Sequence, residues 1–167
     1  MRALFSLLVA APLVGLLVAC GGGSDAEDAA ANEAAAHRAH TAYLEAINSN
    51  DLERFNATIT DDIVYLPPNS PALVGKAAVS EWVKGYLEAY RTVWTKDSLE
   101  FVVDADWAYE RYRYKSVDTP RTDGPAAGTP VATDTGNGIN IYRRDASGAW
   151  RVARDAWATE KAPAPTP

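Results

Sequence analysis

The spacing of apolar residues divides the chain into helical segments followed by a run of strands. The clearest helix begins at Gly75-Lys76, and its apolar residues recur at intervals of three and four: Val79, Trp82, Val83, Tyr86, Leu87 and Tyr90. A stripe this wide and this aromatic has to be buried against a broad flat surface, and a sheet supplies one.

Two further helices are predicted upstream. Regular structure is expected to begin near Asn32, and the first helix carries one stripe of His40, Tyr43 and Ile47 beside a second stripe of His37, Thr41 and Leu44. This helix is expected to end at Asn48-Ser49-Asn50. Asp51 is a side-chain cap for a second, short helix over residues 52–59.

The remaining apolar residues alternate at period two, which is typical of strands. Strands are predicted over residues 63–66, ended by Pro67-Pro68, and over 98–104 and 107–117, with a loop over 118–133. Residues 138–159 form a hairpin around the turn Asp145-Ala146-Ser147-Gly148. Strict alternation in its second strand places Asp155 and Trp157 on one face, and Val152 and Ala156 on the other.

Helices first, and then a meander of long antiparallel strands, is the pattern of an α+β fold. The predicted order is α-α-β-α-β-β-β-β, with the helices covering one face of a curved antiparallel sheet. A carboxylate beside an indole on one sheet face, as in Asp155 and Trp157, suggests the wall of a pocket.

The N-terminal segment is expected to be a targeting sequence. Residues 1–19 contain Arg2 and a short apolar run that ends in small residues, which is typical of a signal peptide. Leu17-Val18-Ala19-Cys20 resembles the bacterial lipobox, so Cys20 is the predicted site of lipidation. Residues 20–31 are expected to be a flexible tether, and residues 161–167 a disordered tail. This predicts an exported lipoprotein, on the periplasmic side of the outer membrane if the cell has two membranes, and otherwise on the outer face of the cell membrane.

Composition excludes several classes of partner. The 167-residue chain has a net charge of −6, which argues against nucleic acid and against electrostatic adhesion to anionic lipid, so the membrane is contacted through the lipid anchor only. Its single cysteine allows no internal disulfide. Neither His37 nor His40 has a partner at metal-ligand spacing, so no metal and no cofactor are predicted.

Two stretches of the sequence carry a family resemblance. The run YLEAINSNDLERFNATITDDIVYLPPNSPALVGKAAVSEWV and the closing INIYRRDASGAWRVARDAWAT resemble the SnoaL-like, ketosteroid-isomerase-like branch of the nuclear transport factor 2 superfamily, over residues 32–160. The resemblance implies a conical curved sheet wrapped around helices, with a small-molecule pocket at its open end. Members include isomerases, cyclases, dehydratases, hydrolases and binders without activity, so the fold does not decide the reaction.

The resemblance also assigns some positions. The helix-one tyrosine that donates to an oxyanion in the isomerases matches Tyr43, and the second oxyanion carboxyl matches Asn140. The general-base aspartate falls at Pro67. Isomerase chemistry is therefore not expected to carry over, although the polar cavity is.

A different set of residues remains as the candidate site. Asp155 is either a general base with a raised pKa or a structural carboxylate paired with Arg111 or Arg154. His40 is either the partner of Asp155 in an acid-base dyad, as in the dehydratases and dehydrohalogenases of this fold, or a polar rim residue. The aromatic residues expected to line a ligand cavity are Tyr43, Tyr65, Trp82, Tyr109 and Trp157.

Two orientations of the strand over residues 107–117 are possible. In one register Arg111 and Arg113 share the inner face with Trp107 and Tyr109, and Arg111 binds an anionic ligand group. In the other, Glu110 and Tyr112 face inward.

Three hypotheses for function follow. The first is a lipid-anchored domain that binds a small, largely hydrophobic molecule without turnover. The second is a SnoaL-like enzyme that uses Asp155, His40 and Tyr43. The third is a homodimeric interaction module, because the exposed sheet face in this superfamily commonly pairs with a second copy.

Overall fold

The computed structural model of the protein describes residues 22–161, with side chains from residue 26 onward. The predicted signal peptide, Cys20 and all of the C-terminal tail beyond Lys161 lie outside this range. The elements in chain order are α1 (Gly22–Ser49), α2 (Leu52–Ala57), β1 (Ile59–Leu66), β2 (Leu73–Val74), α3 (Lys76–Ala89), β3 (Tyr90–Asp104), β4 (Trp107–Pro120), β5 (Ala132–Arg144) and β6 (Trp150–Thr159).

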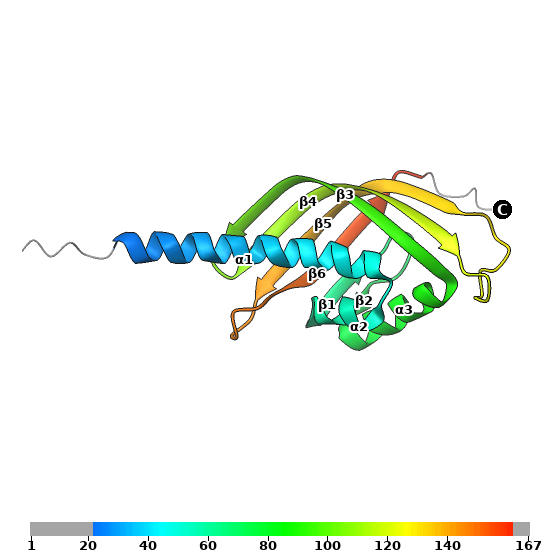
Figure 1. The fold of residues 1–167 in the computed structure, drawn as a ribbon, viewed down its shortest axis with the longest axis horizontal. Helices are drawn as coiled ribbons and strands as arrows, with labels where there is room; N and C mark the ends of the chain where they lie inside the picture. The colour runs from blue at the N-terminus through cyan, green and yellow to red at the C-terminus, as the bar shows by residue number, and fades with distance from the viewer. Residues whose placement is uncertain (1–21, 162–167) are drawn as a thin grey trace, which may run out of the picture.

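One curved sheet of six strands, in the order β2-β1-β6-β5-β4-β3, contains all the described strands. Every neighbouring pair is antiparallel except β1 and β6, which are parallel. Figure 1 shows α1 lying across the concave side of this sheet, with α2 and α3 grouped at one end. The predicted α+β class and the helix-covered curved sheet are therefore confirmed.

The strands are longer than the sequence pattern predicted. β1 starts at Ile59, which the apolar spacing had placed in the second helix, and α2 ends at Ala57. β3 begins at Tyr90 instead of residue 98, and the short strand β2 was not predicted. Polar residues interrupt the alternation at these places, and backbone pairing with a neighbouring strand compensates for weak local patterning.

The first helix also begins earlier than expected, because α1 starts at Gly22 and not near Asn32. The segment predicted to be a flexible tether is thus helical over most of its length. Alanine has the highest helix propensity, and acidic residues such as Glu27 and Asp28 are favourable near a helix N-terminus. Residues 26–31 are exposed, and Figure 1 shows this end of α1 projecting beyond the sheet.

The end of α1 is fastened to the edge strand β3 by two asparagine side chains. The Asn50 amide donates to Thr92 O at 2.8 Å and accepts from Thr92 N at 2.7 Å. Asn48 does the same with the backbone of Trp94, at 2.9 and 2.7 Å. The two amides satisfy edge groups that no strand covers, and they fix Thr92 and Trp94 relative to α1.

A register shift between β5 and β6 changes which residues share a face. The pairing moves from Ile141–Arg154 to Tyr142–Val152, which leaves Ala153 as the extra residue of a β-bulge. Strict alternation had placed Val152 and Asp155 on opposite faces. Instead both are buried, and Val152 belongs to the core cluster against which Trp157 packs.

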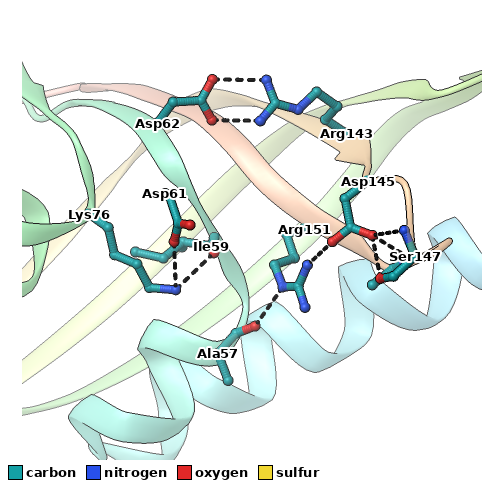
Figure 2. Close-up of polar contacts among 10 residues, drawn as sticks. Ala57, Ile59, Asp61, Asp62, Lys76, Arg143, Asp145, Ser147 and Arg151 are labelled. Carbon is teal, nitrogen blue, oxygen red and sulfur yellow. Dashed lines mark hydrogen bonds and ion pairs between the residues drawn. The ribbon is translucent and has the colours of Figure 1, made fainter.

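Three ion pairs on the outer side connect β1 to β5, the β5–β6 turn to β6, and the start of α3 to β1. Arg143 donates to both carboxylate oxygens of Asp62, at 2.8 and 2.7 Å, and Arg151 pairs with Asp145 (Figure 2). Lys76 lies 3.5 Å from Asp61. These three pairs are called the outer network below.

Among the described helices, none combines the length and apolarity needed to cross a membrane.

Candidate functional site

A cavity of about 450 Å³ opens between the concave face of the sheet, the C-terminal half of α1 and α3. Its walls are mainly aromatic, because Trp82 and Tyr86 of α3 face Trp94 and Trp157 of the sheet. The rings are in contact, with centroid separations of 5.5 Å for Trp82–Tyr86 and 6.1 Å for Trp94–Trp157. A mostly apolar cavity with a few polar groups is typical of a small-molecule site.

Five polar side chains converge at the inner end, which is called the cavity floor here: Tyr43, Tyr65, Lys96, Tyr112 and Asp155. Tyr43 donates to Asp155 Oδ2 at 2.5 Å, and its oxygen lies 3.4 Å from the Tyr65 hydroxyl. Asp155 is only 4% exposed. Burial raises the pKa of its carboxyl, and the positive charge of Lys96 opposes that effect without cancelling it.

Tyr112 reaches Asp155 because a glycine separates them. Tyr112 on β4 is paired with Gly138 on β5, and Gly138 with Trp157 on β6. A Cβ at Gly138 would lie 2.3 Å from the Tyr112 ring. Without that Cβ the tyrosine lies across β5, and its hydroxyl donates to Asp155 Oδ1 at 3.3 Å.

A second group, called the inner cluster here, lies next to the cavity floor and centres on Lys96 and Glu110. Lys96 Nζ is 2.7 Å from Glu110 Oε2, donates to Asn140 Oδ1 at 2.5 Å, and lies 3.7 Å from the centre of the Tyr112 ring. Burial lowers the pKa of the Lys96 ammonium, and Glu110 limits the fall. Burial raises the pKa of Glu110, but His40 and Lys96 outweigh it, so the net pKa is lowered.

His40 belongs to the inner cluster and does not contact Asp155. Its Nδ1 lies 3.1 Å from Glu110 Oε2 and 3.3 Å from the Tyr142 hydroxyl. The predicted His40–Asp155 dyad is therefore wrong. His40 lies against Glu110 of β4, and Asp155 accepts hydrogen bonds from Tyr43 and Tyr112. The predicted convergence of Asp155 and Tyr43 is present, within hydrogen-bond distance.

The alternative ion pair of Asp155 with an arginine is also absent from the described chain. Arg111 pairs with Glu100 at 3.4 Å, and Arg154 donates to the backbone oxygens of Asp62 and Ala153. Lys96 is the cation that acts on Asp155.

The predicted lining residues divide into two groups. Tyr65, Trp82 and Trp157 line the cavity, and Asn140 is buried beside it with its Oδ1 on Lys96. Tyr109 is 37% exposed on the outer face, where Arg111 also lies. The assignment of Tyr109 and Arg111 to the pocket is therefore wrong. The second register is the one present, with Glu110 and Tyr112 among the buried residues of β4. His37 is exposed.

Sequence reasoning missed Lys96 altogether, and it considered Glu110 only as part of the second register. Thr92, Trp94 and Lys96 do alternate at period two, but the polar residues between Thr95 and Ser98 concealed the strand. The available signal was this alternating series itself, because it places Lys96 on the same face of the strand as Thr92 and Trp94.

A second hollow, of about 620 Å³, lies at the outer network, and its lining includes Asp61, Asp62, Lys76, Arg143 and Arg151. Each of its cations is already paired with a carboxylate, as Figure 2 shows. No group of His, Cys, Asp and Glu within residues 22–161 is arranged to hold a metal ion. The cavity with Asp155 at its floor is therefore the candidate site.

Comparison with known proteins identifies the family. Residues 40–154 match the model of the SnoaL-like domain, and the chain belongs to that family. No curated protein matches the chain.

Two solved structures share more than a quarter of their residues with it. A ketosteroid isomerase-like protein from Erwinia carotovora atroseptica is 29% identical, with a TM-score of 0.67 over 77% of this chain and 96% of that one. A conserved protein from Planctomyces limnophilus is 27% identical, with a TM-score of 0.67 over 77% and 98% of the two chains.

A more distant structure, a type 2 hexachlorocyclohexane dehydrochlorinase, is 16% identical, with a TM-score of 0.67 over 81% of this chain and 90% of that one. At that identity the likeness concerns the fold alone. The family and the ketosteroid-isomerase-like fold predicted from the sequence are confirmed. A reaction is not specified by any of these similarities.

Proposed function

We propose that the protein binds a small, largely hydrophobic ring compound, with one oxygen of the ligand facing the Tyr43–Asp155 pair. The observation that carries the proposal is the cavity itself, with aromatic walls and a buried, hydrogen-bonded carboxyl at its inner end. Tyr65 adds a hydroxyl that is 3.4 Å from the Tyr43 hydroxyl, and its ring contacts the ring of Trp157. The Tyr65 hydroxyl accepts from Tyr43, so its own proton can be donated to a carbonyl or hydroxyl oxygen of the ligand.

Binding without turnover is the form of this function that the polar contacts favour. Lys96 is hydrogen-bonded to Glu110 and Asn140, and His40 lies against Glu110, so neither is an obvious base for a ligand in the cavity. The position that matches the isomerase base by resemblance is Pro67, which lines the cavity and brings no titratable group.

Titration of the purified domain with 2-naphthol, a neutral ring compound with one hydroxyl, tests the proposal. Tryptophan fluorescence and calorimetry should both report saturable binding. Tyr65→Phe should weaken it by roughly tenfold, the effect of losing one buried hydrogen bond. Tyr109→Phe, which removes the same hydroxyl from the outer face, is the matched control and should leave affinity unchanged. Equal affinities of wild type and Tyr65→Phe would contradict the proposed orientation.

Proton transfer at Asp155 is the second candidate function. It is favoured by one observation, the raised pKa of a carboxyl that lines a cavity and accepts from Tyr43. Asp155 would remove a proton next to a carbonyl and become protonated, which would free the Tyr43 hydroxyl to turn and donate to the substrate oxygen. Deuterium exchange at the α-carbons of cyclohexanone, followed by NMR, should be faster with wild type than with Asp155→Asn. Equal rates would show that Asp155 does not transfer this proton, and binding without turnover would remain as the proposed function.

The lipid anchor remains a proposal from the sequence. Acylation of Cys20 would attach the chain to a membrane directly before α1, which begins at Gly22. Cys20→Ser should move the protein from the membrane fraction to the soluble fraction without changing its melting temperature. Recovery of the variant in membranes would contradict lipidation.

Pairing of two copies through the outer sheet face is also proposed. Val102, Trp107, Tyr109 and Ile139 are exposed there on three neighbouring strands. Exposed apolar side chains that are contiguous are typical of interaction surfaces. Sedimentation equilibrium should give a dimer, and Ile139→Lys should shift it to the monomer. A monomeric wild type at micromolar concentration would contradict the pairing.

A further inference from the structure

The end of the cavity opposite its floor carries two carboxylates, Asp118 and Asp134. Asp118 lies six residues beyond Tyr112 on β4, on the same face and about 20 Å along the strand. Asp134 on β5 pairs with Ser116 of β4, and both aspartates line the cavity. The cavity thus has two chemically different ends.

Asp118 is a buried carboxylate without an ion pair among the described residues. It is 9% exposed, and Thr92 Oγ1 donates to its Oδ1 at 2.6 Å. Asp134 accepts from Tyr114 at 2.7 Å and from Thr159 at 2.6 Å. Hydroxyl donors orient both groups without neutralising their charge. The buried charge of Asp118 is costly unless a cation approaches it.

The lysines that line the cavity do not supply that cation. Lys96 is committed to Glu110 at the other end. Lys161 lies 3.9 Å from Asp134 with 60% of its side chain exposed, so water screens its charge. Asp51, the remaining carboxylate of this part of the lining, caps α2 through Glu53 N and Arg54 N.

Aromatic rings lie between the two ends. Trp157 has ring centroids of Tyr65, Trp94 and Trp82 at 4.9, 6.1 and 6.5 Å. The face of an indole or phenol attracts an organic cation, and the attraction strengthens when water is excluded. Aromatic walls next to a buried carboxylate without an ion pair favour a positively charged ligand over an anion.

We infer that the ligand of this cavity is an organic cation with a hydrophobic body, an amine or quaternary ammonium whose charged group faces Asp118 and Asp134. The inference rests on the proposed function and specifies its ligand class. It gives the acidic residues of β4 and β5 a role in recognition that the oxygen-binding floor does not explain.

A pair of isosteric probes tests the charge alone. Benzyltrimethylammonium and neopentylbenzene have the same shape and differ by one positive charge. Calorimetry should show the cation binding at least about tenfold more tightly, the size of one desolvated cation–π or ionic contact. Phenylacetate, a ring compound with a carboxylate, should bind more weakly than either. Equal affinities of the two isosteres, or tighter binding of phenylacetate, would overturn the inference.

Variants locate the charge effect. Asp118→Asn keeps the shape and the Thr92 contact, and it should weaken the cation by about tenfold while changing the neutral isostere by less than about twofold. Asp134→Asn should act in the same direction, and it covers the case in which Asp118→Asn does not fold. Asp123→Asn removes an equal charge from an exposed position outside the cavity lining and should change neither affinity. A cation affinity unaffected by both cavity variants would refute the assignment.

The outcome is separable from that of the proposed function. If 2-naphthol binds and benzyltrimethylammonium does not, the cavity binds small ring compounds but has no preference for a cation. If neither binds, both proposals fail.

Discussion

Two groups of paired charges in this domain differ in almost every physical respect. The inner cluster has Lys96 and Glu110 with side chains 3% and 0% exposed, whereas Arg143 and Asp62 of the outer network are 33% and 52% exposed. The outer pair has the better geometry, with two parallel hydrogen bonds. Nevertheless its loss is expected to cost less stability, since water screens the pair. It is expected to contribute nothing to binding, because the cations of the adjoining hollow are already paired with carboxylates.

This contrast indicates that burial, more than pairing, distinguishes the functional end of this sheet. Removing Lys96 and Glu110 from water is costly, and their attraction only offsets that cost. Buried polar groups therefore need a reason to be present, and here they surround the floor of a cavity. If burial is what matters, the effects of substitutions should decrease from the inner cluster to the outer network.

Lys96→Met should have the largest effect on stability. It leaves Glu110 buried without its cation, and breaking a buried ion pair in this way costs about 3–5 kcal/mol. Urea unfolding followed by circular dichroism measures the change. The double variant Lys96→Met, Glu110→Gln should recover a large part of the loss, because no uncompensated charge remains. A single variant that loses less than about 1 kcal/mol would show that the inner cluster is solvated like the outer network.

Gly138→Ala should have the second largest effect. The added methyl group would lie 2.3 Å from the Tyr112 ring, so the ring must move and its hydrogen bond to Asp155 is lost. Overpacking of this kind costs about 1–3 kcal/mol. Gly85→Ala is the matched control: nothing lies within 4 Å of a Cβ there, and in helix α3 the substitution should stabilise by about 0.5–1 kcal/mol. Equal effects at the two glycines would refute the steric role of Gly138.

How far the sequence predicts this site depends on which interaction decides each position. The helix of residues 76–89, the Asp51 cap and the hairpin follow local patterns, and all three are present. The Tyr43–Asp155 contact was predictable only through the family resemblance, because the residues are 112 positions apart.

The errors arise where neighbouring strands decide the outcome. Alternation alone does not reveal the bulge at Ala153, which brings Val152 and Asp155 to one side. Nor does it say which face of β4 is inward, so Tyr109 and Arg111 were assigned to the pocket and Lys96 was missed. A single polar residue on an inward face is recognisable only when its partner, here Glu110, is known to face it.

Asp155 should give a smaller effect that depends on pH. Its folded-state pKa is raised above the ordinary value of 3.8, so the folded protein holds this proton more tightly than the unfolded chain. The resulting stabilisation is complete below about pH 3.8 and is lost as the pH rises through the folded-state pKa. Asp155→Asn does not titrate, and its amide oxygen still accepts from Tyr43.

The free energy of unfolding of wild type, relative to that of Asp155→Asn, should therefore fall as the pH rises from about 4 to neutrality. The fall should be on the order of 1 kcal/mol for each pH unit by which the folded-state pKa of Asp155 exceeds its ordinary value. Urea titrations of both proteins across this range measure it. Glu110, whose pKa is lowered, acts with the opposite sign in both proteins and cancels in the difference. A difference that grows with pH would indicate a lowered pKa and a structural ion pair at Asp155.

Asp62→Asn should have the smallest effect, although the Asp62–Arg143 contact is the most regular ion pair of the outer network. Hydrogen bonds from Arg143 lower the pKa of Asp62 to about 2, so its contribution is present above its ordinary value of 3.8 and is lost as the pH falls toward 2. Because about half of the side chain is exposed, the loss should be only about 0–1 kcal/mol at neutral pH and should shrink further in 1 M salt. Urea unfolding of wild type, Asp62→Asn, Arg143→Gln and the double variant isolates the pair energy. A coupling above about 2 kcal/mol that resists salt would place the outer network in the same energetic class as the inner cluster, and exposure would then not be what separates them.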